Sequence, residues 1–295
     1  MKNNLETNNR PVARFFRKLW RSKTGMLGAA IVLVVTMLAL FAPWIAPHDP
    51  ADQDYSAMLV PPSWVEGGRG EYLLGTDNLG RDILSRIIYG TRVSLLVGVV
   101  SVILAGVIGM AVGLISGFFG GVIDAVFMRL VDAFLSIPSI LFALVLLSVT
   151  GPGISTLVVA LGLTNWVVYA RLVRGEVLSI RERDYVKAAR SIGVKNAAII
   201  MRHILPNVFS SFVVVSALTV ATTIISEASL SFLGLGIQPP TVSWGVMLSD
   251  GRNYLATSWW IATFPGIAIT VTVLGIMFLG DWLRDVLDPR SQISR

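Results

Sequence analysis

Six apolar runs are spread along this chain, and each is long enough to form a helix that crosses a membrane. They lie near residues 26–46, 94–118, 125–150, 154–172, 208–226 and 261–280. A membrane-spanning helix needs about 20 mostly apolar residues. The first run is longer than the roughly 7–15 residues of a signal-peptide core, so we expect a retained anchor. The pattern predicts an all-α integral membrane protein with six transmembrane helices.

The composition agrees with this class of protein. The 295 residues are 54% apolar and 14% charged, with a mean hydropathy of +0.71, whereas about a quarter of the residues of a soluble domain are charged. Because the chain has no cysteine, it has no disulfide, thiolate ligand or catalytic thiol. The histidines, His48 and His203, are expected on opposite sides of the membrane. The sequence therefore predicts no enzyme active site, bound cofactor or metal.

Basic residues predict the orientation of the chain. Seven Lys/Arg precede the first run and eight lie between residues 171 and 202, whereas the segments after the first and fifth runs carry five together. Because cytoplasmic loops are enriched in Lys and Arg, we expect both termini and residues 174–207 in the cytoplasm. The net charge of +6 then reflects topology and contact with anionic lipid headgroups, and gives little reason to expect nucleic acid. The predicted divisions are a cytoplasmic segment 1–25, a first transmembrane helix 26–46, an external loop 47–91, a five-helix domain 92–281 and a cytoplasmic tail 282–295.

Residues 174–207 form a basic segment between the fourth and fifth runs, and their pattern predicts two short helices. Asp184 lies at the start of the first helix, and Gly193 can end it. The small and apolar residues of this helix share one face, which consists of Tyr185, Ala188, Ala189 and Ile192. We expect the second helix to stop at Leu205-Pro206, with Pro206 in the first turn of the fifth span. Small residues permit a partner to approach closely, so the basic segment is the predicted contact surface for another protein.

The loop before the second run contains GTDNLGRD at residues 75–82, which has the glycine spacing of a phosphate-binding loop. That interpretation fails because Arg81 replaces the lysine, Asp82 stands where a Ser or Thr would bind magnesium, and no strand precedes the segment. The segment instead predicts a turn that leads into an amphipathic segment before the second run. A contact with an external partner through Asp77, Arg81 and Asp82 is the alternative.

Charged residues within the runs have two possible roles. Asp124 can cap the third span, while Arg129 and Asp132 are three residues apart and can pair on one helical face. Because Arg129 and Asp132 lie in the first two turns of the span, we expect them to be anchors that extend to the membrane surface, with gating or subunit contacts as the alternative. Glu227 closes the fifth run, where a polar contact at the helix end is favoured over a proton carrier. Pro138 permits a kink in the third span.

Glycines recur in the second run at steps of three or four residues, at Gly106, Gly109, Gly113 and Gly117. Such a face lets two helices approach closely in a membrane. It predicts tight packing within the chain, with a subunit interface or a moving seam as the alternatives.

The motif DYVKAARSIG at residues 184–193, followed by HILPN at 203–207, resembles the coupling loop of ATP-binding cassette importer permeases. The family pattern is Glu-Ala-Ala, three residues, Gly and a later Leu-Pro. Here Lys187 replaces the glutamate and His203 an aliphatic residue, while the alanines, glycine and proline stay in register. The resemblance implies the type I importer permease fold with a cytoplasmic coupling helix. The residues that it assigns to the ATPase-coupling loop are Asp184, Tyr185, Ala188, Ala189, Gly193, Leu205 and Pro206.

Further motifs resemble the dipeptide/oligopeptide/nickel permease group, and within it the second, C-type, subunit. They are LGTD at 74–77, GRD at 80–82, SR at 85–86, YGTR at 89–92, LSFLGLG at 230–236, QPP at 238–240, SWG at 243–245, GDWLRD at 280–285 and LDP at 287–289. The resemblance covers about residues 25–290. It implies import of dipeptides or oligopeptides through the cell (inner) membrane into the cytoplasm. Nickel or metal chelates and glutathione are alternative solutes within the group.

The same resemblance implies a machine of several chains: a homologous B-type permease, two cytoplasmic ATPases that use magnesium ATP, and an external solute-binding protein. Closure of the ATPases on ATP would push on residues 188–193 and move the spans. The chain itself has no nucleotide-binding motif, so the energy would come from these partners. An ion-coupled secondary transporter is the alternative of a different class, and it would need ionisable residues or broken helices near the midplane. Only Arg129, Asp132 and Glu227 approach that description, and a membrane enzyme would lack any acid–base set.

Overall fold

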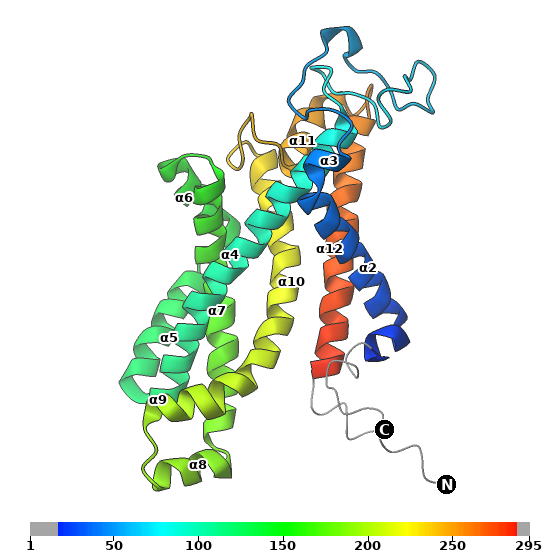
Figure 1. The fold of residues 1–295 in the computed structure, drawn as a ribbon. Helices are drawn as coiled ribbons and strands as arrows, with labels where there is room; N and C mark the ends of the chain where they lie inside the picture. The colour runs from blue at the N-terminus through cyan, green and yellow to red at the C-terminus, as the bar shows by residue number, and fades with distance from the viewer. Residues whose placement is uncertain (1–16, 288–295) are drawn as a thin grey trace, which may run out of the picture.

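The computed structural model describes residues 17–287, which form helices joined by loops (Figure 1). Within these residues the only β-pairing is an isolated bridge between Thr76 and Asp82. The predicted basic N-terminal segment and the C-terminal tail are described only in part. Residues 1–16 and 288–295, which include Asp288-Pro289 of the last motif, lie outside the described residues.

Five helices in this part of the chain are long and apolar enough to cross a membrane. They are α2 (Lys23–Leu40), α4 (Ile83–Phe119), α7 (Ile154–Arg181), α10 (Leu205–Phe232) and α12 (Trp260–Leu287). The shorter elements are α3 (Ala42–Ile45), η1 (Tyr55–Ala57), α5 (Gly121–Leu135), α6 (Ser139–Thr150), α8 (Asp184–Ser191), α9 (Asn196–Ile199), the π-helical turn η2 (Ile200–Ile204), α11 (Trp244–Gly251) and η3 (Arg252–Tyr254). The five long helices match five of the six expected spans.

The third expected span is broken into two helices. α5 and α6 meet at a bend of 84°. The break lies at Ser136 to Pro138, where Pro138 precedes the first residue of α6. Proline has no N–H to donate and disfavours a helical conformation in the residue before it. The kink expected at Pro138 is therefore present, and the bent pair brings the number of candidate spans to six if it counts as one span.

The glycine face of α4 packs within the chain. A Cβ atom added to Gly113 would lie 2.6 Å from Cβ of Val173 on α7, and one added to Gly106 would lie 2.7 Å from the ring of Phe212 on α10. Real Cβ atoms do not approach other atoms so closely, so only glycine permits these helix contacts. The prediction of tight packing within the chain is confirmed for this face.

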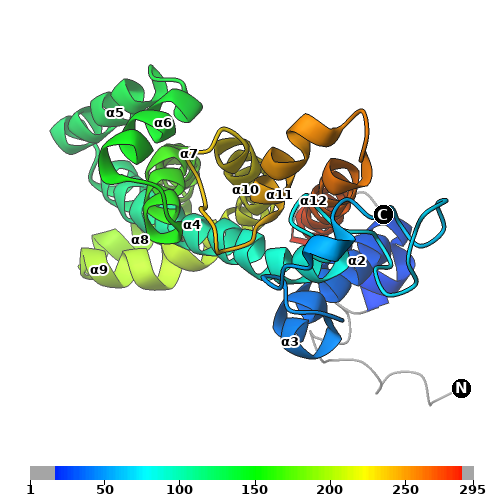
Figure 2. The same cartoon turned by 90° about the horizontal axis from the view of Figure 1, so that it is seen from above.

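The helices place two groups of polar side chains at opposite ends of the molecule. α4 has 37 residues, about 55 Å of helix, and crosses from the side of α2 and α12 to the side of α5 and α7 (Figures 1 and 2). α8 and α9 lie at one end, together with the start of α2 and the end of α12 (Figure 1). α11 and the loop before α4 lie at the other. We refer to these as the α8 end and the α11 end.

Candidate functional site

α8 has one face buried in the protein and one face exposed. Val186 is 1% and Ala189 8% exposed, and both belong to one buried cluster with Phe118 of α4, Ile180 of α7 and Val208 of α10. On the opposite face, the exposed residues are Tyr185, Ala188 and Ile192, at 42% for Tyr185 and 80% for Ile192. The predicted shared face is thus wrong for Ala189, which turns inward with Val186 because residues three apart lie together on a helix. The exposed face presents a small residue between two larger apolar ones.

The backbone conformation of Gly193 terminates α8. Its φ of +79° is in the left-handed region, which glycine adopts without a steric cost. The N–H of Gly193 donates to the carbonyl of Arg190, and the N–H of Val194 donates to that of Ala189, both at 3.1 Å. This pair of bonds is the Schellman arrangement that satisfies the last carbonyls of a helix. The expected end of the first short helix at Gly193 is therefore present.

The second short helix does not stop where the sequence predicts. α9 continues through the π-helical turn at Ile200–Ile204 directly into α10. Pro206 is the second residue of α10, so its expected place in the first turn of the fifth span is confirmed. The N–H of Leu205 donates to Ile200, five residues back. The expected stop at Leu205-Pro206 is wrong, because the turn of wider pitch carries the helix past the proline.

Two ion pairs join α7 to α5 near this end. Nε and Nη2 of Arg174 donate to the two carboxylate oxygens of Asp124 at 2.5 and 2.6 Å. Nη2 of Arg171 lies 2.6 Å from Oδ1 of Asp132, with both side chains 56% exposed. The expected pair of Asp132 with Arg129 is not formed, because the turn after α4 brings α7 beside α5. Asp124 lies in the first turn of α5 but does not cap it, since the capping position is Gly120.

Further contacts join α8 and the end of α7 to their neighbours. Nη1 of Arg181 donates to the carbonyl of Gly117 at 2.8 Å, and the guanidinium of Arg190 lies 5.2 Å from the centre of the Phe118 ring. Nζ of Lys187 lies 3.2 Å from Oε2 of Glu182, and its hydrogen bond lowers the pKa of that carboxyl. These contacts join α8 and the end of α7 to the end of α4. Arg181, Glu182 and Val186 are the contributors to this contact that the sequence analysis missed.

At the α11 end, Asp77 holds the loop before α4. Its Oδ1 accepts from the N–H groups of Leu79 and Arg81 at 2.8 and 3.0 Å, and its Oδ2 accepts from the side chains of Arg81 and Arg86. Both arginines also donate to Asp250 at 3.1 Å. The segment is thus a turn stabilised by its own charges, and neither Arg86 nor Asp250 was expected to take part.

Asp82 has a local role in the same turn. It is the N-cap of α4 and accepts from the N–H of Ser85 at 2.8 Å. Asp77 and Asp82 are 1% and 2% exposed, whereas Arg81 is half-buried. Since both carboxylates are engaged within the chain, contact of Asp77, Arg81 and Asp82 with an external partner stays a prediction.

Glu227 is fully buried within α10, directly after the end of the expected span at residue 226. Its Oε1 accepts from the hydroxyls of Ser231 and Ser243, both at 2.9 Å, and its Oε2 accepts from Ser94 at 3.0 Å. The expected polar contact is present, but it does not lie at a helix end, because α10 runs on to Phe232. One carboxylate thus joins α10 to α4 and to the start of α11. Roles of Asp124, Arg129, Asp132 and Glu227 in gating or subunit contacts stay predictions.

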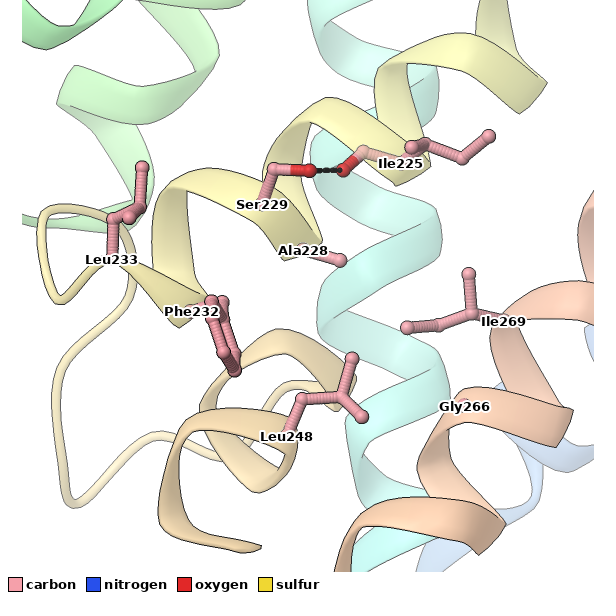
Figure 3. A pocket seen from close by; sticks show the side chains of 8 residues that line it. All are labelled: Ile225, Ala228, Ser229, Phe232, Leu233, Leu248, Gly266 and Ile269. Atoms are coloured by element: carbon pink, nitrogen blue, oxygen red, sulfur yellow. Dashed lines mark hydrogen bonds between the residues drawn. The ribbon is translucent and has the colours of Figure 1, made fainter. Parts of the chain in front are cut away.

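A hollow of ≈ 490 Å³ lies beside this part of α10, between α10, α11 and α12 (Figure 3). Its lining is apolar and includes Ile225, Phe232, Leu248 and Ile269. The one hydroxyl in the lining, of Ser229, donates to the carbonyl of Ile225 at 2.8 Å. This hollow offers no group for catalysis or metal binding. Across residues 17–287, no group of three or more His, Cys, Asp or Glu could hold a metal ion.

A bundle of five long apolar helices and one bent pair, with a short helix packed at one end, is the architecture of a multi-pass membrane protein. A family model described as binding-protein-dependent transport system inner membrane component matches residues 109–293. A second, described as the N-terminal TM domain of oligopeptide transport permease C, matches residues 10–62. The chain therefore belongs to the family of binding-protein-dependent transport system inner membrane components, the permeases of ATP-binding cassette importers.

Curated relatives cover nearly the whole chain. The dipeptide transport system permease protein DppC of Escherichia coli (strain K12) is 49% identical over 280 residues, which are 95% of this chain and 93% of that protein. The di/tripeptide transport system permease protein DppC of Pseudomonas aeruginosa (strain UCBPP-PA14) is 41% identical over 280 residues, 95% of this chain and 92% of that protein. The resemblance to the dipeptide/oligopeptide group is confirmed.

A solved structure shares the fold. It is an inward-facing conformation of the MetNI methionine ABC transporter, with a TM-score of 0.58 and 21% identity, and it covers 70% of this chain and 98% of that one. At this identity the likeness concerns the fold alone. The expected all-α fold of type I importer permeases is confirmed.

Proposed function

We propose that this chain is the C-type permease subunit of an importer that carries dipeptides and short oligopeptides into the cytoplasm. Its relatives are named as dipeptide and di/tripeptide permeases, with 49% and 41% identity. We propose peptides rather than nickel, metal chelates or glutathione because these relatives are named as peptide permeases. In the assembly, the chain pairs with a B-type permease and receives solute from an external binding protein.

In this proposal α8 is the part of the chain that contacts the ATPases. The observation that supports it is that one face of α8 is buried in the protein and the other is exposed. The exposed face, with Tyr185, Ala188 and Ile192, is available to pack in a groove of another protein. The opposite face, with Val186 and Ala189, is buried against the ends of three long helices. Apolar side chains exposed on a short basic helix are the arrangement expected of a helix that docks in a partner's groove. Force applied to α8 then reaches α4, α7 and α10 through packed side chains.

The energy comes from two partner ATPases that hydrolyse magnesium ATP, and the α8 end faces the cytoplasm. Supporting this orientation, the basic residues of α7 and α8 lie at the end where α2 begins and α12 finishes (Figure 1). The positive-inside rule assigns such an end to the cytoplasm. Both termini then lie on the cytoplasmic side of the cell membrane.

A single-cysteine experiment tests the contact, because the chain has no cysteine of its own. Ile192→Cys, on the exposed face of α8, is expected to cross-link to the ATPase subunit in the purified complex, with a yield that changes when ATP is added. Val149→Cys is the matched control, because Val149 is as exposed, at 80%, but lies in α6. Cross-linking of both positions alike, or of neither in a complex that contains the ATPases, would contradict the proposal.

A further inference from the structure

A second hollow, of ≈ 370 Å³, lies at the α11 end between segments that are far apart in the sequence. One wall is a face of α4 in the helical spacing i, i+3, i+4 and i+7, formed by Tyr89, Arg92, Val93 and Leu96. The start of α7 and the loop before α11 complete it, through Ile154 and Thr241 among others. We call it the Arg92 hollow. Its volume is at the lower end of the range of small-molecule sites, about 300–1,000 Å³.

Arg92 differs from Arg81 and Arg86, which precede it in the loop before α4 and in the first turn of that helix. Arg81 and Arg86 are neutralised by Asp77 and Asp250. Arg92 is exposed, and no described carboxylate lies within 4.0 Å of its guanidinium. Arg92 therefore lines the hollow without an acidic partner from residues 17–287.

Two hydroxyl groups line the same hollow with unused hydrogen-bonding capacity. Neither the phenol of Tyr89 nor the hydroxyl of Thr241 has a hydrogen-bond partner among the described residues, although both side chains are half-buried. A guanidinium donates two parallel bonds to a carboxylate, and each hydroxyl can add one donor. Val93, Leu96 and Ile154 supply an apolar wall next to these donors.

We propose that the Arg92 hollow binds the C-terminal carboxylate of the transported peptide, with the last side chain of the peptide against Val93, Leu96 and Ile154. This proposal rests on the proposed function, because a short peptide is the solute that carries a carboxylate next to an apolar side chain. Arg92 is the principal ligand, since the planar fork of its guanidinium matches the two oxygens of a carboxylate. Tyr89 and Thr241 orient the carboxylate.

Accessibility of one cysteine tests for the peptide directly. Leu96 is 49% exposed, and Leu96→Cys would place the only thiol of the chain in the hollow. In the complete importer reconstituted in liposomes, a dipeptide with a free C-terminus is expected to slow labelling of this thiol by a maleimide at least threefold. The same dipeptide as its C-terminal amide is expected to give no protection. Equal protection by the two forms would overturn the proposal.

Substitution of the arginine distinguishes a peptide site from a lipid site and from a protein-docking site. Arg92→Gln in the Leu96→Cys chain should abolish protection by the dipeptide, whereas Arg92→Lys should retain part of it. Protection that follows the content of anionic lipid without peptide would assign the hollow to a lipid headgroup. Protection by the binding protein without peptide would assign it to protein docking. Either result overturns the peptide site.

Uptake by cells that carry the whole importer gives an independent readout. Arg92→Gln is expected to lower dipeptide uptake roughly tenfold or more, the usual effect of losing a hydrogen-bonded charge, with ATPase subunits still bound. Arg69→Gln is the matched control, since Arg69 lies in the loop before α4 and its guanidinium donates to the carbonyl of Ser56, away from the hollow. Normal uptake by Arg92→Gln would refute the site alone. A wild-type importer that carries no peptide at all would refute the proposed function.

Discussion

Replacement of Gly193 tests whether the conformation of this residue or its small size matters for coupling. The φ of Gly193 is +79°, and apart from its two chain neighbours no atom of residues 17–287 lies within 4 Å of a Cβ built there. Within the chain, alanine would therefore meet no obstacle, and its cost would be the left-handed backbone alone. That cost is about 1–2 kcal/mol, which lowers the population of the intact Schellman end about 5- to 30-fold relative to glycine. Asparagine adopts this conformation more readily than alanine.

The two possible roles of Gly193, its backbone conformation or its small size, therefore predict opposite orders of coupling for Gly193→Asn and Gly193→Ala. If conformation governs coupling, Gly193→Asn should import more peptide per ATP hydrolysed than Gly193→Ala, although asparagine is larger. If a partner surface approaches the glycine closely, alanine should be the better substitute because it is smaller. The assay is the ratio of peptide imported to ATP hydrolysed by the complex in liposomes, with the amount of bound ATPase measured in parallel. We expect the first order, since the end of α8 is open to solvent at this position.

The result that would refute the conformational argument is specific. It is an asparagine variant that loses ATPase binding while the alanine variant keeps it. Equal and normal coupling in both variants would show that the Schellman end of α8 contributes nothing to coupling. Thermal unfolding of both variants should stay close to that of the wild type, because the buried contacts of Val186 and Ala189 are unchanged.

The spans could be predicted from the sequence because a helix needs about 20 mostly apolar residues to cross a membrane. The residues at which the helices begin and end could not be predicted. α4 begins at Ile83, eleven residues before the expected 94, because Asp82 caps it and α11 covers its first turns. Likewise the run 125–150 predicts one span and a kink at Pro138, but the size of the bend, 84°, depends on packing against α7.

Partners of charged side chains were the least predictable part of the candidate site. Local spacing suggested Arg129 for Asp132, but the partner is Arg171, 39 residues away. Glu227 and Ser94 are 133 residues apart. Such pairs depend on which helices become neighbours, and a single sequence does not contain that information. The position of α8 and its end at Gly193 were predictable because capping is local.

Three further substitutions test the contacts that support the two ends, each by thermal unfolding of the purified chain in detergent. Asp124→Asn removes the negative charge and one of the two oxygens that accept from the Arg174 guanidinium. The free energy of unfolding is expected to fall by about 1 kcal/mol, because the pair is partly exposed to solvent. No change would show that the pair only orients α5. Glu227→Gln leaves three serine donors facing an amide that can accept only through one oxygen. The free energy of unfolding should therefore fall by about 1–3 kcal/mol. Ser229→Ala on the same helix should be neutral, since that hydroxyl binds only its own backbone. Gly109→Ala should cost about 1–3 kcal/mol, because its Cβ would lie 2.5 Å from a carbonyl oxygen of α7. Gly175→Ala, within α7 and with no atom within 4 Å of its Cβ, should gain up to about 1 kcal/mol from helix propensity. The two glycines differ only in what surrounds them, so equal effects would contradict the claim that α4 and α7 pack backbone to backbone through the glycine face.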